Sequence, residues 1–463
     1  MSYETAVAQM YALGHELAQT PSHKFDLAHI RVLLAALGHP ENSFPTVLVA
    51  GTNGKGSTAA TLASILQASG LKTGLYTSPH LVRINERIRL NGKPIADDDF
   101  AMLHDVVDRT AERLVGEGDL PWHPSFFETL TAMAFEYFAR NRPDMVVLEV
   151  GMGGRLDATN VVEPRLSIIT DISLDHQKYL GETVGEIARE KAGIIRPGGI
   201  VVTLPQLPEA NDVIGNTILD VGARAVNAVP YVPPVSPSSG QWQRYPLDVM
   251  GAQIMIESPL VGRHQLRNLA LAIAAAEELH NQDIENHGTA QITPETIAQG
   301  IRETHWPGRF QVVPAAGDDP EYVLDVAHNP AGAWALRSTL SAAYQNPRNG
   351  ELGIGNGEPG DAREITLVFG VMRDKAVREI TEILFPIAGH VIVTHANNPR
   401  SASPGEIRQA AARVAAGIEI EEAEDVASAL GRARKVAGSG GLVVVTGSIY
   451  IVGEAMRTLG VGI

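Results

Sequence analysis

The sequence predicts an α/β fold, and two observations support this prediction. Short segments rich in β-branched and other apolar residues recur along the chain. They alternate with glycine-rich or polar turns and with stretches of helical periodicity. Nearly continuous apolar strands of this kind are typical of parallel sheets that are covered on both faces. The predicted strands are residues 46–50, 145–150, 166–170, 365–370, 390–394 and 442–447.

Breaks in composition divide the chain into two predicted domains. Residues 229–241 are rich in proline and serine and predict a surface loop, and residues 248–260 then predict a short antiparallel excursion. Residues 345–364 predict a glycine-rich connection. Because residues 304–310 fall between a predicted helix and a new strand, we place the domain boundary there. The predicted domains are residues 1–302 and 303–463.

The composition excludes several classes of protein. The chain of 463 residues carries 53 acidic and 37 basic residues, a formal charge of −16, so we expect neither nucleic acid nor an anionic membrane as a partner. It contains no cysteine, which excludes disulfides, thiolate nucleophiles and zinc–thiolate sites. The N-terminus does not resemble a signal peptide, and no apolar run reaches the roughly 20 residues of a membrane helix. We expect a cytoplasmic monomer.

The first predicted strand leads directly into a phosphate-binding loop. The sequence GTNGKGST begins at Gly51 and is followed by a segment with an apolar face at helical spacing. Glycines allow successive N–H groups to point at one anion, and the N-terminus of a helix adds partial positive charge. Lys55 can reach a β- or γ-phosphate, and Ser57 or Thr58 can bind phosphate or Mg²⁺. One glycine is inserted relative to GxxxxGK[ST], and the alternative is a glycine-rich turn with a surface lysine.

Two further predicted strands end in side chains that suit a metal site. Glu149 ends the strand 145–150 and precedes the glycine-rich sequence GMGG. Ligands of doubly wound sheets bind at this carboxyl edge, and Mg²⁺ takes one or two hard oxygen ligands. His176 lies just beyond the strand 166–170, where a neutral imidazole can bind a metal. Each residue taken alone could equally be structural or solvated.

Lys191 occupies an unexpected place in the helical pattern. Val184, Ile187, Ala188 and Lys191 recur at helical spacing, so the lysine shares the apolar face. Burial would lower the pKa of this amine and make its neutral form available to react with CO₂ and give a carbamate. The alternative is an aliphatic stem that leads the ammonium into water.

Taken together, the motifs resemble a known family. The segments GTNGKGS, YTSPHL, GRLDATN, SLDH, REKAGII, GRHQLRN, WPGRF and DVAHNP occur in this order, with weaker matches in VFGVMRDK, THANNPRS and TGSIYIVGE. This series resembles the folylpolyglutamate synthase/dihydrofolate synthase family of the Mur ligase superfamily. The resemblance implies a P-loop NTPase-like parallel-sheet ATPase domain and a smaller Rossmann-like α/β C-terminal domain.

The resemblance also implies an activity and a set of site residues. The implied reaction phosphorylates a carboxylate with ATP, after which the amine of L-glutamate displaces phosphate with the help of two Mg²⁺ ions. A requirement for a monovalent cation stays open. The implied triphosphate-binding residues are Asn53, Gly54, Lys55, Gly56 and Ser57. The implied metal ligands are Ser78 and Glu149 for one ion and His176 for the second, beside a carbamylated Lys191. The other implied nucleotide contacts are Asn268, Arg309 and Asp325, and His328 lies close to the transferred phosphate.

The substrate site follows from the same resemblance. The sequence GGRLDATN is similar to the version in enzymes that also use dihydropteroate, and it places Leu156, Asp157 and Ala158 in the pteroate site. The other wall is formed by Ser125, Phe126, Phe127 and Glu128. The expected small-molecule partners are dihydropteroate, folates and L-glutamate, and the alternative is an enzyme that only extends folates.

Three other classes of protein compete with this interpretation. A peptidoglycan-precursor ligase would need an extra N-terminal domain, and only about 45 residues precede the first strand. A nucleotide switch would hydrolyse ATP without regard to glutamate. A dinucleotide-dependent oxidoreductase would need a strand–GxGxxG–helix unit, and the spacing of GMGGRLDATN departs from it.

Overall fold

The computed structural model describes residues 1–14, 26–234, 242–285, 291–345, 363–413 and 418–462. Within them, the chain forms two compact units. The first unit comprises Met1–Val232, Asp248–Ile254 and Asn268–Ile301, and the second comprises Pro233–Leu247, Met255–Arg267 and Arg302–Ile463. The predicted loop at 229–241 and the predicted connection at 345–364 lie largely outside the described residues. The predicted division into 1–302 and 303–463 stays a prediction.

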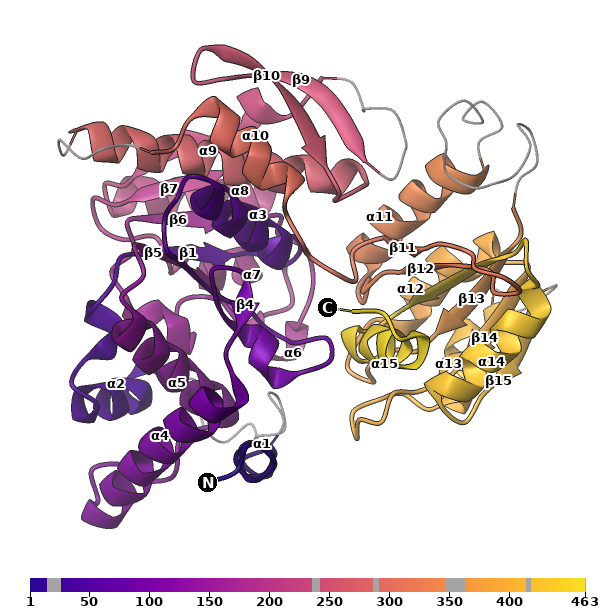
Figure 1. Cartoon of the computed structure of the whole chain (residues 1–463), viewed down its shortest axis with the longest axis horizontal. Helices are drawn as coiled ribbons and strands as arrows, with labels where there is room; N and C mark the ends of the chain where they lie inside the picture. Colours follow the sequence, from indigo (N-terminus) through magenta and orange to yellow (C-terminus); the bar gives the residue numbers. More distant parts are fainter. Residues whose placement is uncertain (15–25, 235–241, 286–290, 346–362, 414–417, 463) are drawn as a thin grey trace. The chain divides into compact units, whose positions relative to one another are not determined.

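The first unit is built on an eight-stranded sheet with the order β4-β3-β2-β5-β1-β6-β7-β8 (Figure 1). The strands from β2 to β8 in this order are parallel, and β3 and β4 add antiparallel at one edge. The strands are β1 (Thr46–Ala50), β2 (Thr73–Tyr76), β3 (Ile88–Leu90), β4 (Lys93–Pro94), β5 (Met145–Glu149), β6 (Leu166–Ile169), β7 (Ile200–Thr203) and β8 (Arg224–Asn227). Every residue of β1, β5 and β6 is buried, as expected for central strands covered on both faces.

In the first unit, helices connect most of the successive parallel strands, as a parallel sheet requires. They are α1 (Tyr3–Ala12), α2 (Leu27–Ala36), α3 (Lys55–Ala68), α4 (Asp97–Glu117), α5 (Phe126–Asn141), α6 (Gln177–Leu180), α7 (Val184–Ala192) and α8 (Pro208–Asp220), together with α9 (Arg263–Glu285) and α10 (Pro294–Arg302). Four 3₁₀ turns, η1 (Pro40–Asn42), η2 (Ile84–Arg87), η3 (Ala158–Val161) and η4 (Val229–Tyr231), lie in connections of this unit within the described residues. Strands β9 (Gln243–Val249) and β10 (Ala252–Ser258) pair with each other, at the predicted excursion.

The second unit contains a six-stranded sheet with the order β11-β12-β16-β13-β14-β15. Only β11 runs antiparallel to its neighbour among these described strands. The strands are β11 (Gln311–Val313), β12 (Glu321–Leu324), β13 (Ile365–Phe369), β14 (His390–Val393), β15 (Glu419–Glu422) and β16 (Leu442–Thr446). The helices are α11 (Pro330–Leu340), α12 (Val377–Leu384), α13 (Pro404–Ala410), α14 (Val426–Ala437) and α15 (Ile449–Leu459).

Side chains from both faces of this second sheet are buried. Leu367 and Phe369 of β13 join one apolar core with side chains of α11 and α12. Val368, between them, is also fully buried, and α14 contacts the same strand. All six predicted strands are therefore strands in the structure, and the α/β class is confirmed. Within the described ranges, no helix is both long and apolar enough to cross a membrane.

Candidate active site

The predicted phosphate loop connects β1 to α3. Gly54 has a φ of +89° and stands immediately before the first residue of α3, Lys55. A Cβ atom at Gly54 would lie 2.1 Å from Oδ1 of Asn268, and a Cβ at Gly51 would lie 1.8 Å from Oγ1 of Thr170. Both positions therefore require glycine. The N–H groups of the first turn of α3 have no acceptor within the helix and give this end of the loop its affinity for anions.

The first half of the loop is tied to the chain that follows β6. The N–H groups of Thr52 and Asn53 both donate to the carbonyl oxygen of Asp171, at 2.9 and 3.1 Å. The Asn53 side chain donates to Oγ of Ser173 at 3.2 Å, and Oγ1 of Thr170 donates to the Asn53 carbonyl at 2.8 Å. The backbone N–H of Asn53 is therefore already used within the protein. Its contact with triphosphate stays a prediction, and the predicted anion site begins with the N–H groups from Gly54 onward.

Lys191 is buried, which decides between the two alternatives that its helical spacing left open. It lies on α7 with only 4% of its surface exposed, and its Nζ donates to the carbonyl oxygen of Gly51 at 2.7 Å. Burial, together with the nearby charge of Lys55, lowers the pKa of this amine to about 7. A large fraction of the amine is therefore neutral near pH 7. Lys55 itself donates to the carbonyl of Thr52 at 3.3 Å, so both lysines lie at the base of the loop.

Ser78 and Glu149 lie together at the carboxyl edge of the first sheet. Glu149 is the last residue of β5 and is 5% exposed, and its Oε2 accepts a hydrogen bond from the Ser78 N–H at 3.3 Å. Ser78 follows β2, the neighbour of β5. A carboxylate and a hydroxyl are the hard oxygen donors that Mg²⁺ prefers, so this pair fits the predicted ion.

His176 stands in the turn that precedes α6. Its φ is +50°, and its N–H donates to Oδ1 of Asp175 at 2.8 Å. The charge of Asp175 acts on Lys191 and opposes the fall of its pKa. Asp175 thus links His176 to the region of the buried lysine. That His176 binds a metal stays a prediction.

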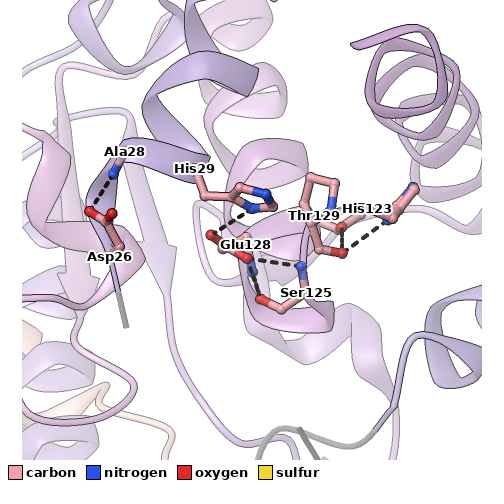
Figure 2. A network of polar contacts seen from close by, with 8 residues as sticks. Asp26, Ala28, His29, His123, Ser125, Glu128 and Thr129 are labelled. Carbon is pink, nitrogen blue, oxygen red and sulfur yellow. Dashed lines mark hydrogen bonds and ion pairs between the residues drawn. The ribbon is translucent and has the colours of Figure 1, made fainter. Parts of the chain in front are cut away.

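Ser125 and Glu128 form a capping box at the start of α5 (Figure 2). Oε2 of Glu128 accepts from the N–H and the hydroxyl of Ser125 at 2.9 and 2.7 Å, and Oγ of Ser125 accepts from the Glu128 N–H at 3.2 Å. His29 of α2 lies 3.6 Å from Oε1 of Glu128. Burial works to raise the pKa of Glu128, but the hydrogen bonds from His29 and Ser125 outweigh it and the pKa is lowered. Both residues therefore stabilise the N-terminus of α5.

The two phenylalanines of the same segment lie in different surroundings. Phe126 is 3% exposed and stacks on Tyr11, with ring centroids 5.9 Å apart, and the guanidinium of Arg87 lies 5.3 Å from its centroid. Phe127 is half-buried beside Tyr76, and a Cβ at Gly151 would lie 2.5 Å from its ring. Phe127 thus packs against the glycine-rich segment that follows Glu149. Substrate contact by either ring stays a prediction.

Asp157 organises the glycine-rich segment from within. Its Oδ2 accepts from the Met152 N–H at 2.9 Å, and its Oδ1 accepts from the N–H and hydroxyl of Thr159 at 3.0 and 2.6 Å. Burial raises the pKa of this carboxyl group, and these hydrogen bonds oppose the rise. Ala158 is buried and Leu156 half-buried. The role of these three residues toward a pteroate stays a prediction.

The nucleotide-binding residues predicted in the second unit lie on two loops that Asp325 holds together. Its Oδ2 accepts from the Phe310 N–H at 2.8 Å, and its Oδ1 accepts from the Ala327 N–H at 2.9 Å. Burial raises the pKa of Asp325, and the charge of Arg309 opposes that rise. Nδ1 of His328 lies 2.9 Å from the Val326 carbonyl, which can only accept, so this nitrogen carries the hydrogen.

Asn268 belongs to the first unit and lies against the phosphate loop. It is 3% exposed on α9, its Oδ1 faces Gly54, and its carbonyl oxygen accepts from Oγ1 of Thr58 at 3.4 Å. The structure therefore brings Asn268 to the predicted triphosphate site.

Sequence reasoning missed one group of polar residues in this region. Asn85, Glu86 and Arg87 are consecutive and only 2%, 5% and 2% exposed. The available indication was their place between the apolar residues Ile84 and Ile88, where charged side chains need buried partners.

Comparisons with known proteins find matches to two family models and to curated relatives. Residues 116–276 match the Mur ligase middle domain, and residues 308–449 match the Mur ligase glutamate ligase domain. The chain is 34% identical over 438 residues to the dihydrofolate synthase/folylpolyglutamate synthase of Bacillus subtilis (strain 168), covering 94% of each chain. It is 36% identical over 377 residues to the folylpolyglutamate synthase of Lacticaseibacillus casei, covering 81% of each.

Solved structures give the same result. The folylpolyglutamate synthase of Mycobacterium tuberculosis complexed with ADP and AMPPCP matches with a TM-score of 0.85 and 30% identity over 99% of both chains. The apo form of the L. casei enzyme matches with a TM-score of 0.80 and 31% identity over 99% of this chain and 100% of the other. The resemblance seen in the sequence motifs is confirmed. This chain belongs to the dihydrofolate synthase/folylpolyglutamate synthase family and is an ATP-dependent ligase with Mur ligase domains.

Proposed function

We propose that the chain ligates L-glutamate to two acceptors, the carboxylate of dihydropteroate and the γ-carboxylate of folates, through an acyl phosphate. The observation that carries the ligase chemistry is the phosphate loop, in which Gly54 opens α3 with Lys55 and the buried Lys191 at its base. The choice of two acceptors is supported by relatives named for both activities, among them those of B. subtilis and Escherichia coli (strain K12).

In the first step, a carboxylate oxygen of the acceptor attacks the γ-phosphorus of ATP. The bond from this phosphorus to the β–γ bridging oxygen breaks, which releases ADP and leaves an acyl phosphate. Lys55 and the N–H groups from Gly54 to Ser57 hold the phosphates, because this transfer needs positioning and charge neutralisation more than covalent help. Ser78 and Glu149 would hold a Mg²⁺ ion, which supplies positive charge to the phosphates when bound.

In the second step, the amine of L-glutamate attacks the acyl carbon. The carbon–oxygen bond to phosphate breaks, phosphate leaves, the nitrogen loses a proton, and an amide remains. His328 would act beside the transferred phosphate through Nε2, because its Nδ1 donates to the Val326 carbonyl. Arg309 adds positive charge on the neighbouring loop, and Asp325 keeps that loop in place. Water must be excluded during this step, since it would hydrolyse the acyl phosphate.

Lys191 is proposed to become a carbamate. Its neutral amine adds to CO₂, so that a nitrogen–carbon bond forms, one proton is released, and the neutral side chain becomes an anion. The pKa of about 7 makes the neutral amine available. The carbamate would support a second Mg²⁺ ion together with His176.

Substrate recognition is proposed for two groups of residues around Gly151. The segment 156–158 follows the glycine-rich turn, and Phe127 packs against the same turn. Flat aromatic surfaces suit a pterin ring. Phe126, Ser125 and Glu128 support this wall from the start of α5.

The assay measures ADP release with Mg-ATP and L-glutamate, in parallel with dihydropteroate and with a reduced folate monoglutamate. Glutamate-dependent turnover with both acceptors is the expected result. Turnover with the folate alone would support the second candidate, a folylpolyglutamate synthase like that named in L. casei. A rate of ATP hydrolysis that is the same with and without either acceptor would contradict the ligase proposal and indicate a nucleotide switch.

A further inference from the structure

The loop that follows β2 carries Ser78 and is anchored at its beginning. The N–H of Thr77 donates to the carbonyl oxygen of Arg87 at 3.0 Å, and the N–H of Ser78 donates to Oε2 of Glu149 at 3.3 Å. The loop then continues through Pro79 and His80 to residues 81–83. The position of the Ser78 hydroxyl therefore depends on what holds the remainder of this loop.

Glu86 holds the far end of the loop through its carboxylate. Oε2 accepts from the Leu81 N–H at 2.9 Å, Oε1 accepts from the Val82 N–H at 2.8 Å, and Oε1 also accepts from the Arg83 N–H. Three consecutive N–H groups thus surround one carboxylate that is only 5% exposed. Hydrogen bonds to a charged acceptor are about twice as strong as neutral ones, and buried N–H groups left without an acceptor are costly.

The next residue, Arg87, fixes the side chain in the middle of the loop. Its Nε donates to Nδ1 of His80 at 2.8 Å, so Nδ1 acts as an acceptor and the ring hydrogen lies on Nε2. Nε2 lies 3.2 Å from the hydroxyl of Tyr11, to which it can donate. Glu86 and Arg87 together therefore determine both the backbone and the histidine of residues 80–83.

We propose that Glu86 is a positioning residue, which sets the Ser78 hydroxyl beside Glu149 for a divalent cation. This inference rests on the proposed function, in which Ser78 and Glu149 hold Mg²⁺. Only Pro79 and His80 separate Ser78 from the N–H groups that Glu86 binds, so a shift at Leu81 is transmitted over a short length of chain. Replacing a residue that orients a metal ligand without binding the metal itself typically changes metal affinity by about 10- to 100-fold.

The test uses the full-length chain with Glu86→Gln, which keeps the shape of the side chain and loses the charge and one acceptor oxygen. The matched control is Asp97→Asn. Asp97 lies nearby and accepts from Arg83 and Asn85 side chains, but it is 47% exposed and bonds no N–H of the loop in the described contacts. Mn²⁺ is the probe, and its dissociation constant is measured by EPR titration in the presence of a non-hydrolysable ATP analogue.

We expect Glu86→Gln to raise the Mn²⁺ dissociation constant about tenfold and to speed amide hydrogen exchange in residues 81–83, with Asp97→Asn close to wild type in both. In the Ser78→Ala background, Glu86→Gln should weaken Mn²⁺ binding by less than twofold further, because both changes act on one ligand. A Mn²⁺ constant for Glu86→Gln that equals the control would overturn the inference. If Glu86→Gln does not fold, Glu86→Asp is judged by the same criteria.

The two proposals fail in different ways. A wild-type chain that binds no Mn²⁺ with the nucleotide analogue would contradict the metal site of the proposed function. A wild-type chain that binds Mn²⁺ normally, with Glu86→Gln unchanged, would contradict the positioning role alone.

Discussion

Lys191 combines two properties that rarely occur together, full burial and a hydrogen bond to the backbone of a nucleotide loop. Its amine donates to the Gly51 carbonyl, and burial lowers its pKa although the charges of Asp175 and Asp157 oppose this fall. The cost of burying an ammonium is avoided when the amine loses its proton or becomes a carbamate. The unusual environment is thus consistent with a lysine that reacts rather than one that only packs.

The pKa of Lys191 predicts how stability depends on pH. Between about pH 7 and the unfolded value near 10.5, the unfolded chain keeps a proton on this amine that the folded chain has lost. Rising pH therefore favours the folded state in this window, by up to about 1.4 kcal/mol per pH unit from this group. Denaturant unfolding in CO₂-free buffer should show this gain in the wild type and not in Lys191→Met. If the free energy of unfolding changes with pH in the same way in the two proteins, the result would contradict a buried amine with a lowered pKa.

The second prediction at the scale of the residue concerns Gly54. Gly54→Ala should weaken ATP binding at least tenfold, because its Cβ would meet Asn268 at 2.1 Å in a backbone conformation with positive φ. Gly116→Ala is the matched control, since nothing lies within 4 Å of its Cβ on α4. The control should bind ATP normally and gain about 0.5–1 kcal/mol of stability. Isothermal titration calorimetry measures the affinity of both variants for ATP. Equal affinities of Gly54→Ala and Gly116→Ala would contradict the close packing of the loop.

At the scale of the element, α5 joins the core to the predicted pteroate wall through its capping box. Ser125→Ala should cost about 1 kcal/mol of unfolding free energy, because it removes the acceptor for the Glu128 N–H. Ser403→Ala removes the equivalent cap of α13 in the second unit. If Ser125 also supports the substrate wall, only Ser125→Ala raises the KM for dihydropteroate. Equal KM values for the two variants would limit Ser125 to capping.

A second prediction at this scale concerns the two loops that Asp325 joins. The positions of both loops depend on the carboxylate of this one residue. Phe310 has a φ of +49°, which is unfavourable outside glycine, and its N–H bonds Asp325. Asp325→Asn should therefore speed hydrogen exchange at Phe310 and Ala327 and raise the KM for ATP about tenfold. Asp319→Asn, which breaks a surface ion pair with Arg434, is the control. If exchange at Phe310 stays slow while the KM rises, Asp325 acts on the nucleotide directly and does not position the loop.

At the scale of the whole molecule, the strands and the phosphate loop were predictable because their evidence is local. The continuous apolar run of β1 and the glycines after it lie next to each other in the sequence, and the helical spacing of Lys191 placed it on an apolar face while its burial stayed open. The closeness of the two predicted metal ligands depends on the order of the strands, which places β2 beside β5 and so brings Ser78 to Glu149.

Glu86 shows what sequence patterns alone did not reveal. Its carboxylate can be buried because three backbone N–H groups donate to it. Every residue except proline has a backbone N–H group, so the amino-acid sequence does not show which of these groups bind a carboxylate. The same holds for Asn53 and Asp325, whose bonds to the backbone depend on tertiary structure. The structure brings Ser78 to Glu149 and Asn268 to the phosphate loop, whereas the gathering of the other predicted residues stays a prediction.

The central claim concerns the whole enzyme, namely that an acceptor carboxylate is activated as an acyl phosphate before glutamate attacks. The most direct measurement uses dihydropteroate labelled with ¹⁸O in its carboxylate, together with ATP and L-glutamate, and follows the label by mass spectrometry. The account predicts one ¹⁸O atom in each phosphate released and one retained in the new amide. Phosphate that carries no label, with its fourth oxygen taken from water, would contradict the account.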